Sequence, residues 1–434
     1  MISTLLYFIV ALGLLVFVHE LGHFLVAKRA GIRVERFSLG YPPKMIGITI
    51  GETEYCISWI PFGGYVKVAG MADVGTADTS GAPWEFPSKP IWVRMAVIAA
   101  GPFMNFAFAF VAFLGLFVAY GIDTYDTTAV LPAEHSPAAQ AGVLRGDQVL
   151  RVAGERVANE HQLRQALKAT HRRGAELEVQ RGDQVLQLSL PAADQENYGL
   201  DHLLLTAVGQ VVPDMPAAQI GLQPGDRIIG VAGQPVADWE QMKEQISRHP
   251  GESIQLEWER ENQRLQAQIT PVAHTEGDKS VGQIGIAPKV SQAAVGAGEA
   301  LRLSGRVLYN SSWMILDFIR QLFQGDRSTE ELGGPLRIAQ MAGQTGEQGL
   351  KSFISFLAML SVNLAIINLL PIPVLDGGLL TFLALEAIRR RPLTLRQQQV
   401  FQQVGLAIML FIMVLVTFND LNQMVFHRIV EWFG

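Results

Sequence analysis

The sequence predicts a polytopic α-helical membrane protein, with four transmembrane helices and two copies of a small β-rich domain outside the membrane. Its 434 residues are 49% hydrophobic and only 17% charged, with a mean hydropathy of +0.23, whereas soluble domains carry about 25% charged residues. Four long apolar stretches and an internal repeat between the second and third complete the pattern. The net charge of −6 gives nucleic acid no general attraction. The single cysteine, Cys56, excludes an internal disulfide framework.

Each apolar stretch is long enough to cross a hydrocarbon core of roughly 30 Å as a helix. Pro371 and Pro373 break the third stretch, because proline interrupts a straight helix. The first stretch also has the length of a signal peptide, but its Lys28 and Arg29 follow the apolar run instead of preceding it, so we interpret it as a retained span. We place the four spans at residues 1–27, 95–122, 353–388 and 397–419.

The short loops rich in Lys and Arg predict the orientation of these spans. Such loops lie at residues 28–94 and 389–396, and cations of this kind favour the cytoplasmic side. Both termini, including a tail over residues 420–434, and the long segment 123–352 are then expected on the opposite side.

The long segment repeats itself at an offset of 79 residues. Residues 136–142 match residues 215–221, and the Gly-Asp pair at 146–147 recurs at 225–226 without an insertion. Each copy has the pattern of a short strand, a helix and two alternating strands. A fixed register of this kind indicates two copies of one domain. We place these domains at residues 123–204 and 205–275, followed by a linker with amphipathic helices at 276–352.

Helical spacing appears within this linker. Between residues 299 and 323, apolar side chains recur every seven residues, at Leu301, Leu308, Ile315 and Leu322. The pattern predicts an amphipathic helix, which either lies at the outer membrane face or packs on the two repeated domains, with ordinary packing within the protein as the alternative.

The first span contains the motif HExxH, formed by His19, Glu20 and His23. On a helix, residues four apart share a face, so both imidazoles can bind one ion. Glu20 follows the first ligand and can take a proton from water that the ion activates. Ionisable groups in an apolar span are costly and mark functional sites. The pattern therefore predicts a metal site, with zinc preferred by ligand type.

A catalytic zinc needs a third protein ligand and an open position. The other histidines all lie outside the apolar spans, and Asp376 is the one acidic residue well inside another span. It also fits a turn aspartate before Gly377 and Gly378. At membrane depth, however, a carboxylate needs a partner, so we predict Asp376 as the third ligand.

These motifs resemble those of the site-2 protease family of intramembrane zinc metalloproteases. The resemblance covers nearly the whole chain: HExxH in the first span, Asn368-Leu-Leu-Pro-Ile-Pro-Val-Leu-Asp-Gly377 in the third, and a repeat that resembles tandem PDZ domains. It implies a polytopic α-helical membrane protein with two tandem PDZ-like β-rich domains. Glu20 is then the general base, and His19, His23 and Asp376 bind one Zn²⁺. The implied location is the bacterial inner (cytoplasmic) membrane, with the termini and PDZ domains on the periplasmic side.

The resemblance also implies substrate contacts in the third span. Asn368, Pro371 and Pro373 match the segment of the family that contacts substrate, while a plain helix break is the alternative. Asn105, in the second span, and Asn363 are candidates for supporting the site, although helix packing explains either of them.

A second substrate-binding candidate lies in the loop 28–94. Strand-like residues 55–60 and 64–68 flank a Gly-Gly turn and predict a membrane-associated β-hairpin. In the family a similar segment dips into the membrane and pairs with an extended substrate, which makes Gly63, Gly64 and Tyr65 candidate contacts. A purely structural hairpin is the alternative.

The expected function is that of an intramembrane zinc endopeptidase. Its partners are the lipid bilayer and single-span substrates, such as an anti-sigma factor after a first cleavage or remnant signal peptides, and no nucleic acid. The PDZ pair would gate substrate access or bind peptide or envelope-protein ligands. The alternative is a non-catalytic PDZ-bearing membrane scaffold with a structural or vestigial metal site. A closed structural site uses four protein ligands, and the spans supply three.

Overall fold

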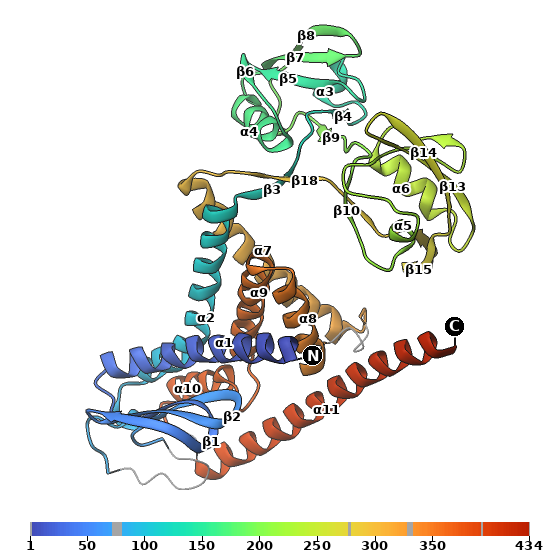
Figure 1. Ribbon diagram of the computed structural model, residues 1–434. Helices are drawn as coiled ribbons and strands as arrows, with labels where there is room; N and C mark the ends of the chain where they lie inside the picture. The colour runs from blue at the N-terminus through green and yellow to red at the C-terminus, as the bar shows by residue number, and fades with distance from the viewer. Residues whose placement is uncertain (1, 72–79, 277–278, 328–332, 392–393, 434) are drawn as a thin grey trace. The chain divides into compact units, whose positions relative to one another are not determined.

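The computed structural model describes residues 2–71, 80–276, 279–327, 333–391 and 394–433. Parts of the predicted loops 28–94 and 389–396 and of the linker 276–352 therefore lie outside the described residues, as do residues 1 and 434. The chain forms two compact units, which we describe separately (Figure 1). Unit 1 comprises Met1–Tyr120 and Val295–Gly434, and unit 2 comprises Gly121–Ala294.

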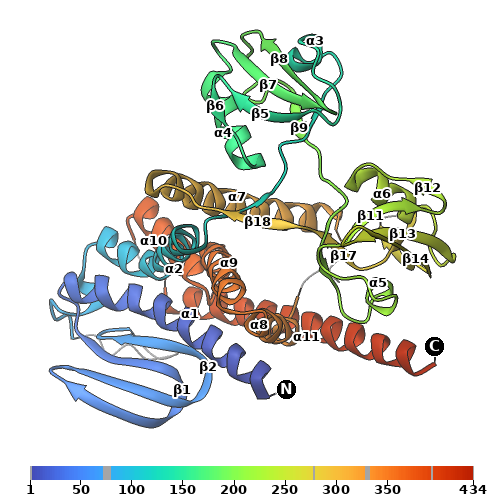
Figure 2. The same cartoon turned by 45° about the horizontal axis from the view of Figure 1, so that its top comes forward.

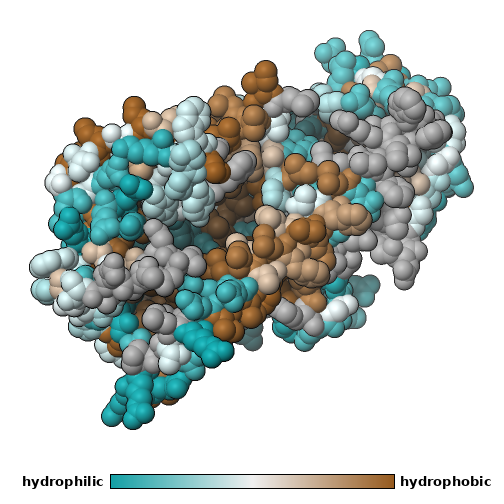
Figure 3. Space-filling view, turned by 90° about the horizontal axis from the view of Figure 1, so that it is seen from below, coloured by the Kyte–Doolittle hydropathy of each residue, from teal (hydrophilic) through white to brown (hydrophobic). Residues whose placement is uncertain are grey.

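Among the described residues, four helices of unit 1 are long and apolar enough to cross a membrane. Apolar side chains are also widely exposed, as the brown areas of Figure 3 show. Two helices extend well beyond the predicted spans: the second begins four residues earlier, at Ile91, and the last continues to Phe433. The four helices are α1 (Ile2–Arg29), α2 (Ile91–Tyr120), α9 (Leu350–Leu369) and α11 (Leu395–Phe433).

Helix α2 forms the centre of unit 1, because α1, α9 and two further helices, α7 (Ala297–Gln324) and α10 (Asp376–Arg389), contact it. Ala109 and Phe113 of α2 are buried against Ala358 and Val362 of α9. The amphipathic helix α7 (Ala297–Gln324) packs on this pair through its apolar face (Figure 2). Its packing residues are Val307, Leu308, Ile315 and Ile319.

The short helix α8 (Pro335–Glu347) packs against both the first and the last apolar helix. Its Gly343 and Gly346 lie directly against Thr4 and Tyr7 of α1, where a larger residue would overlap these side chains. At its N-terminus, Asp420 of α11 accepts hydrogen bonds from three backbone amides, at Gly334, Leu336 and Arg337. A carboxylate 83 to 86 residues away in sequence therefore caps the helix.

The third apolar stretch is divided into two helices. α9 ends at Leu369, and α10 (Asp376–Arg389) begins after a turn that contains Pro371 and Pro373. Gly378 and Leu379 donate backbone hydrogen bonds to the carbonyl of Leu375, which closes the first turn of α10. The broken span predicted from the prolines is present, and the break places Asp376 at a helix N-terminus.

Strands β1 (Val34–Ile50) and β2 (Thr53–Val68) pair in three registers, and residues 46–50 of β1 pair with residues 53–57 of β2 across the turn that joins the strands. Residues 36–39 of β1 pair with residues 54–57 on one side and with residues 64–67 on the other. The predicted hairpin about Gly63-Gly64 is therefore wrong, because residues 55–60 and 64–68 flank β1 instead of pairing with each other. The hairpin turn lies at Gly51-Glu52, where glycine adopts a positive φ of 63°.

Unit 2 contains two β-rich modules whose elements recur at the 79-residue offset. Each has a four-stranded sheet of the same order, β6-β5-β7-β8 in the first and β12-β11-β13-β14 in the second. Module 2 extends past the predicted boundary at residue 275, because β17 (Ile286–Pro288) pairs with β10 (Val208–Val211). The elements of module 1 are β4 (Val130–Pro132), α3 (Pro137–Gln140), β5 (Gln148–Val152), β6 (Glu155–Arg156), α4 (Glu160–Thr170), β7 (Ala175–Arg181), β8 (Gln184–Leu190) and β9 (Leu200–His202). Besides β10 and β17, the elements of module 2 are α5 (Pro216–Gln219), β11 (Arg227–Val231), β12 (Gln234–Pro235), α6 (Trp239–Ser247), β13 (Ile254–Arg260), β14 (Gln263–Ile269), β15 (Val272–Glu276) and β16 (Lys279–Gln283).

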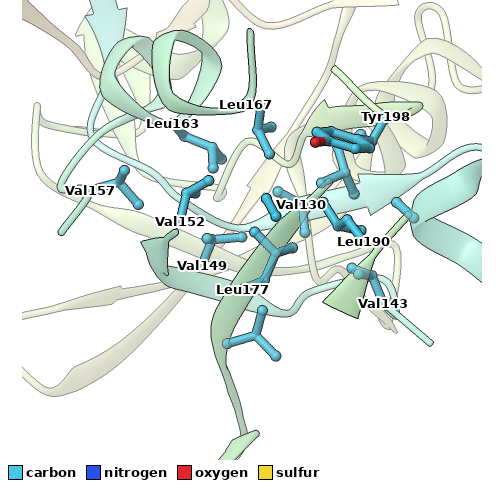
Figure 4. Packing of buried hydrophobic residues seen from close by; sticks show 14 residues of the cluster. Val130, Val143, Val149, Val152, Val157, Leu163, Leu167, Leu177, Leu190 and Tyr198 are labelled. Atoms are coloured by element: carbon cyan, nitrogen blue, oxygen red, sulfur yellow. The ribbon is translucent and has the colours of Figure 1, made fainter. Parts of the chain in front are cut away.

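The repeat also preserves the internal contacts of each module. Alternating apolar residues of the sheet and the inner face of α4 form the core of module 1, shown in Figure 4 with Val149, Leu163 and Leu177 among its members. In module 1, Arg181 donates to both carboxylate oxygens of Asp147 at 2.7 Å, and Arg260 donates to Asp226 at the same distances in module 2. Corresponding positions of the two modules therefore form the same ion pair.

Unit 2 begins and ends in one two-stranded ribbon. β3 (Ile122–Tyr125) pairs antiparallel with β18 (Val290–Ala293), and Ile122 lies opposite Ala293. Gly121, at a φ of +69°, comes so close to the carbonyl of Ala293 that a Cβ would overlap it. The first and last residues of unit 2 are therefore neighbours.

Candidate metal centre

The three residues predicted as metal ligands meet where α1 contacts α10. α1 places His19 and His23 one turn apart on one face, with their Nε2 atoms 3.2 Å from each other. Oδ2 of Asp376 lies 3.1 Å from Nε2 of His19 and 3.5 Å from Nε2 of His23. All three side chains are largely buried, with 11 to 14% of each exposed.

The donor set fits a zinc ion. The three ligand atoms lie within 4.8 Å of one another. Oδ2 of Asp376 is buried and receives no hydrogen bond from the residues that the structure describes. Two imidazole nitrogens and one carboxylate oxygen form the three-ligand set of a catalytic zinc, which keeps a fourth position open.

Helix α2 orients the ring of His23. Its Nδ1 lies 2.8 Å from the carbonyl oxygen of Val97. Because a carbonyl can only accept, Nδ1 carries the proton in this hydrogen bond, which leaves the lone pair of Nε2 in the neutral ring directed at the metal position. Such an outer hydrogen bond fixes both the tautomer and the orientation of a ligating histidine.

Asn105 of α2 has the corresponding place beside His19. The Asn105 side chain is fully buried, and its Nδ2 lies 3.2 Å from Nδ1 of His19. Its Oδ1 has no hydrogen-bond partner among the described residues. With the amide in the opposite orientation, Oδ1 accepts the proton of Nδ1, and Nε2 of His19 is again free to bind a metal. Asn105 is therefore placed to support the centre.

Glycine allows α1 and α2 to approach closely at this point. A Cβ at Gly101 of α2 would overlap the rings of both His19 and His23. A Cβ at Gly22 of α1 would overlap the backbone carbonyl of Ala100. The close packing of α1 and α2 at Gly101 therefore forms one wall of the metal centre.

Glu20 lies beside both the metal ligands and strand β2. Its carboxylate interacts with both histidines, with Asp376 and with the backbone amide of Val66. A Cβ at Gly64 would lie 3.3 Å from Cγ of Glu20. The last segment of β2 therefore runs directly past the predicted general base.

Gly63 and Tyr65 flank this contact. Gly63 has a φ of +123°, and a Cβ there would meet the ring of Tyr41. The ring of Tyr65 stacks on Tyr41 at 6.3 Å, and its hydroxyl accepts a hydrogen bond from Arg36. Lys44 and Arg36 both donate to Glu54, and these hydrogen bonds lower the pKa of that carboxyl. These bonds hold the sheet that carries Gly63, Gly64 and Tyr65.

The remaining predicted residues lie along the broken span. Asn363 and Asn368 belong to α9 and are partly buried, and their side-chain amides make no hydrogen bond among the described residues. Pro371 is exposed in the turn, and Pro373 contacts α11, where a Cβ at Gly405 would overlap it. Among the described residues, no hydrogen bond or ion pair joins any of these four to His19, His23 or Asp376.

Sequence reasoning missed two tertiary contacts of unit 1, one at the metal centre and one at the N-terminus of α8. The carbonyl of Val97 carries no signal in a sequence, because every residue has one. Asp420 does carry a signal, since it is an acidic residue at the end of an apolar stretch, and ionisable groups there mark tertiary contacts.

Comparisons with known proteins place the chain in a family. The sequence model of the family described as Peptidase family M50 matches residues 7–412 of this chain. A putative zinc metalloprotease of Neisseria meningitidis serogroup A is 33% identical, and the match covers 97% of this chain and 99% of that protein. The regulator of sigma-E protease RseP of Escherichia coli K12 is also 33% identical, over 96% of this chain and 98% of its own length. The resemblance to the site-2 protease family is thereby confirmed.

Solved structures that resemble part of the chain include PDZ domains. One is the PDZ domain of an SdrC-like protein from Listeria monocytogenes, with 25% identity, 19% of this chain and 84% of that chain covered, and a TM-score of 0.17. The family match over most of the chain and the full-length relatives together show that the chain belongs to peptidase family M50 and is a zinc metalloprotease.

Proposed function

We propose that this protein hydrolyses peptide bonds within the transmembrane segments of single-span membrane proteins. The observation that carries the proposal is the convergence of His19, His23 and Asp376 within 4.8 Å, with both histidines on α1, a helix long and apolar enough to cross a membrane. A soluble substrate would have no access to ligands on such helices. A transmembrane segment approaches them through the bilayer.

The ligands and Glu20 have separate roles in this proposal. His19, His23 and Asp376 hold one zinc ion, which supplies Lewis acidity to the scissile carbonyl and to water. Glu20 accepts the proton of the attacking water and delivers it to the leaving amine. Asn105 and the carbonyl of Val97 keep the two imidazoles in their metal-binding orientation.

The substrate is held as an extended strand beside β2. Residues 64–67 pair with β1 on one side, and no other described strand pairs with them on the other. An edge of this kind binds an extended peptide through its main-chain groups. Because Gly64 lies against Glu20, a strand added here passes the general base. Gly63, Gly64 and Tyr65 form this substrate edge, and Asn368, Pro371 and Pro373 border the approach from the broken span.

The two modules of unit 2 are tandem PDZ-like domains on the periplasmic side of a bacterial inner membrane. They restrict access to substrates whose outer domain has already been shortened. The name of the E. coli relative, regulator of sigma-E protease, supports an anti-sigma factor as a substrate class, and remnant signal peptides are a second class with the same single-span form.

Cleavage by the purified protein in detergent tests the proposal. The substrate is a single-span protein with a truncated outer domain, and the wild type is compared with Glu20→Gln and with chelator-treated enzyme. Product from the untreated wild type alone supports a zinc peptidase with Glu20 as base. Zinc bound without product from several such substrates favours a scaffold with a structural metal. Equal product from Glu20→Gln excludes Glu20 as the base.

A further inference from the structure

An ion pair joins α10 to α2 at the end of α10 that is remote from the metal ligands. Nη2 of Arg94 donates to Oε1 of Glu386 at 2.6 Å, and Nη1 donates to Oε2 at 3.3 Å. Only 15% and 22% of the two side chains are exposed. A two-point contact between a guanidinium and a carboxylate fixes orientation as well as distance.

Contacts with other helices help to fix the position of α10. It has only 14 residues, and it is separated from α9 by the turn at residues 370–375. In this turn Val374 has a φ of +84°, a strained conformation for a β-branched residue. The turn breaks the continuity between α9 and α10, and α10 packs on α2 more extensively than on α9, so contacts with α2 act together with the turn to set how far α10 lies along its own axis.

One turn of α2 contacts both α1 and α10, the two helices that carry the predicted metal ligands. Val97, whose carbonyl holds His23 of α1, follows Arg94 by three residues. Leu379, Leu380 and Leu383 of α10 pack against the cluster that contains Val97. Apolar packing of this kind is non-directional and tolerates sliding, whereas the two hydrogen bonds of the ion pair do not.

We propose that Arg94 and Glu386 are positioning residues that set the axial position of α10, so that Asp376 reaches His19 and His23. The inference rests on the proposed metal site. A slide of one helical turn moves a residue by about 5.4 Å, whereas Oδ2 of Asp376 is 3.1 Å and 3.5 Å from its partners. A slide of one turn therefore removes Asp376 from the donor set.

Charge exchange tests this role with zinc affinity as the readout. Full-length protein in detergent is titrated with zinc against a competing chelator. We expect Arg94→Gln and Glu386→Gln each to weaken zinc binding by roughly 10- to 100-fold, as loss of outer support does in other metal sites. The double variant Arg94→Glu/Glu386→Arg restores the pair with reversed polarity and recovers most of the wild-type affinity.

Lys28→Gln is the matched control. Lys28 pairs with Glu52 at 3.1 Å at the end of α1, and neither this ion pair nor its hydrogen bond joins α1 to α10 among the described residues, so its loss should leave zinc affinity unchanged. A purely stabilising role for Arg94 and Glu386 would lower the melting temperature without changing zinc affinity, and that result overturns the proposal. Failure of the exchanged pair to recover zinc binding also overturns it.

A distance measurement in the metal-free protein tests the proposal without relying on zinc binding. Nitroxide labels are placed at the exposed positions Val111 of α2 and Ile388 of α10, in a Cys56→Ser background. In the metal-free protein we expect each single variant to shift or broaden the distance distribution by about 5 Å, one helical turn, and the exchanged pair to restore it. An unchanged distribution refutes the positioning role. Absence of zinc from the wild type would instead refute the proposed function.

Discussion

The ring of His23 on α1 is hydrogen-bonded to the backbone of Val97 on α2, at 2.8 Å from Nδ1 to the carbonyl oxygen. α2 contributes none of the predicted metal ligands, yet it contacts both histidines, through Val97, Gly101 and Asn105. The geometry of the centre therefore depends on how closely α1 and α2 approach each other.

Replacement of Gly101 by alanine should disrupt the metal centre. The added Cβ overlaps the rings of His19 and His23, so we expect loss of bound zinc and of peptidase activity, measured by metal analysis and substrate cleavage. Gly115→Ala is the control in the same helix, because nothing lies within 4 Å of a Cβ there. Alanine replaces glycine favourably in a helix interior, so Gly115→Ala should retain zinc. Equal zinc content in both variants would contradict the close-approach argument.

Asn105 should affect zinc affinity more than catalysis by a zinc-saturated enzyme. Asn105→Leu removes the polar partner of Nδ1 of His19, and loss of such a partner weakens metal binding by roughly 10- to 100-fold. Zinc titration against a chelator measures the change. Asn363→Leu makes the same chemical change on α9, where the amide has no described hydrogen bond. A similar loss in both variants would indicate a general packing effect.

The cap at α8 should depend on the acceptor atoms of Asp420. Asp420→Ala removes the acceptors of three backbone amides, and loss of an N-cap costs about 1 kcal/mol. We expect faster hydrogen exchange over residues 335–347, measured by mass spectrometry. Asp420→Asn keeps one acceptor oxygen and should show a smaller increase. Unchanged exchange in the alanine variant would show that packing on α1 alone holds this helix.

The modules of unit 2 should lose stability in acid through one pair of residues each. Burial opposes the ionisation of Asp147, but hydrogen bonds from Arg181 and the amide of Leu144 outweigh it and lower the pKa of the carboxyl. Because the folded pKa lies below the unfolded value of about 3.9, the stabilisation is complete above that pH and is lost as the pH falls through the folded pKa. Asp226 behaves in the same way beside Arg260.

Hydrogen exchange of β7 at a series of pH values measures this effect in the full-length protein. Arg181→Gln should weaken protection near neutral pH and flatten its fall below about pH 4. Arg172→Gln, which changes an exposed cation of the same module, should follow the wild type. A wild-type pH profile in Arg181→Gln would exclude the ion pair as the cause.

The sequence is informative about two kinds of feature: ionisable residues whose burial in an apolar stretch is energetically costly, and a domain that recurs at a fixed spacing. His19, Glu20, His23 and Asp376 could be grouped because each is ionisable in an apolar stretch, and the structure places the three predicted ligands within 4.8 Å. The repeat could be recognised because its two copies keep one register. These signals are local or strictly periodic, so they survive without knowledge of the folded chain.

Contacts set by tertiary pairing could not be predicted in the same way. The Gly-Gly pair at 63–64 has the composition of a hairpin turn, but the chain crosses there from one side of β1 to the other, and Gly51-Glu52 forms the tight turn. Strand pairing depends on which edge is available, and local composition does not encode this. The bonds from Gly334 to Asp420 and from Arg94 to Glu386 likewise join residues 86 and 292 positions apart.

The ribbon of β3 and β18 has a consequence for how such proteins change over generations. Since Ile122 and Ala293 are opposite each other, the whole of unit 2 is an insertion whose two ends meet, and a short turn from Tyr120 to Val295 could replace it without lengthening either neighbouring helix. A duplication, deletion or exchange of modules beyond the ribbon leaves the hydrolytic bundle with the same boundary. Under the proposed function, substrate selection by unit 2 and peptide hydrolysis by unit 1 can therefore change independently.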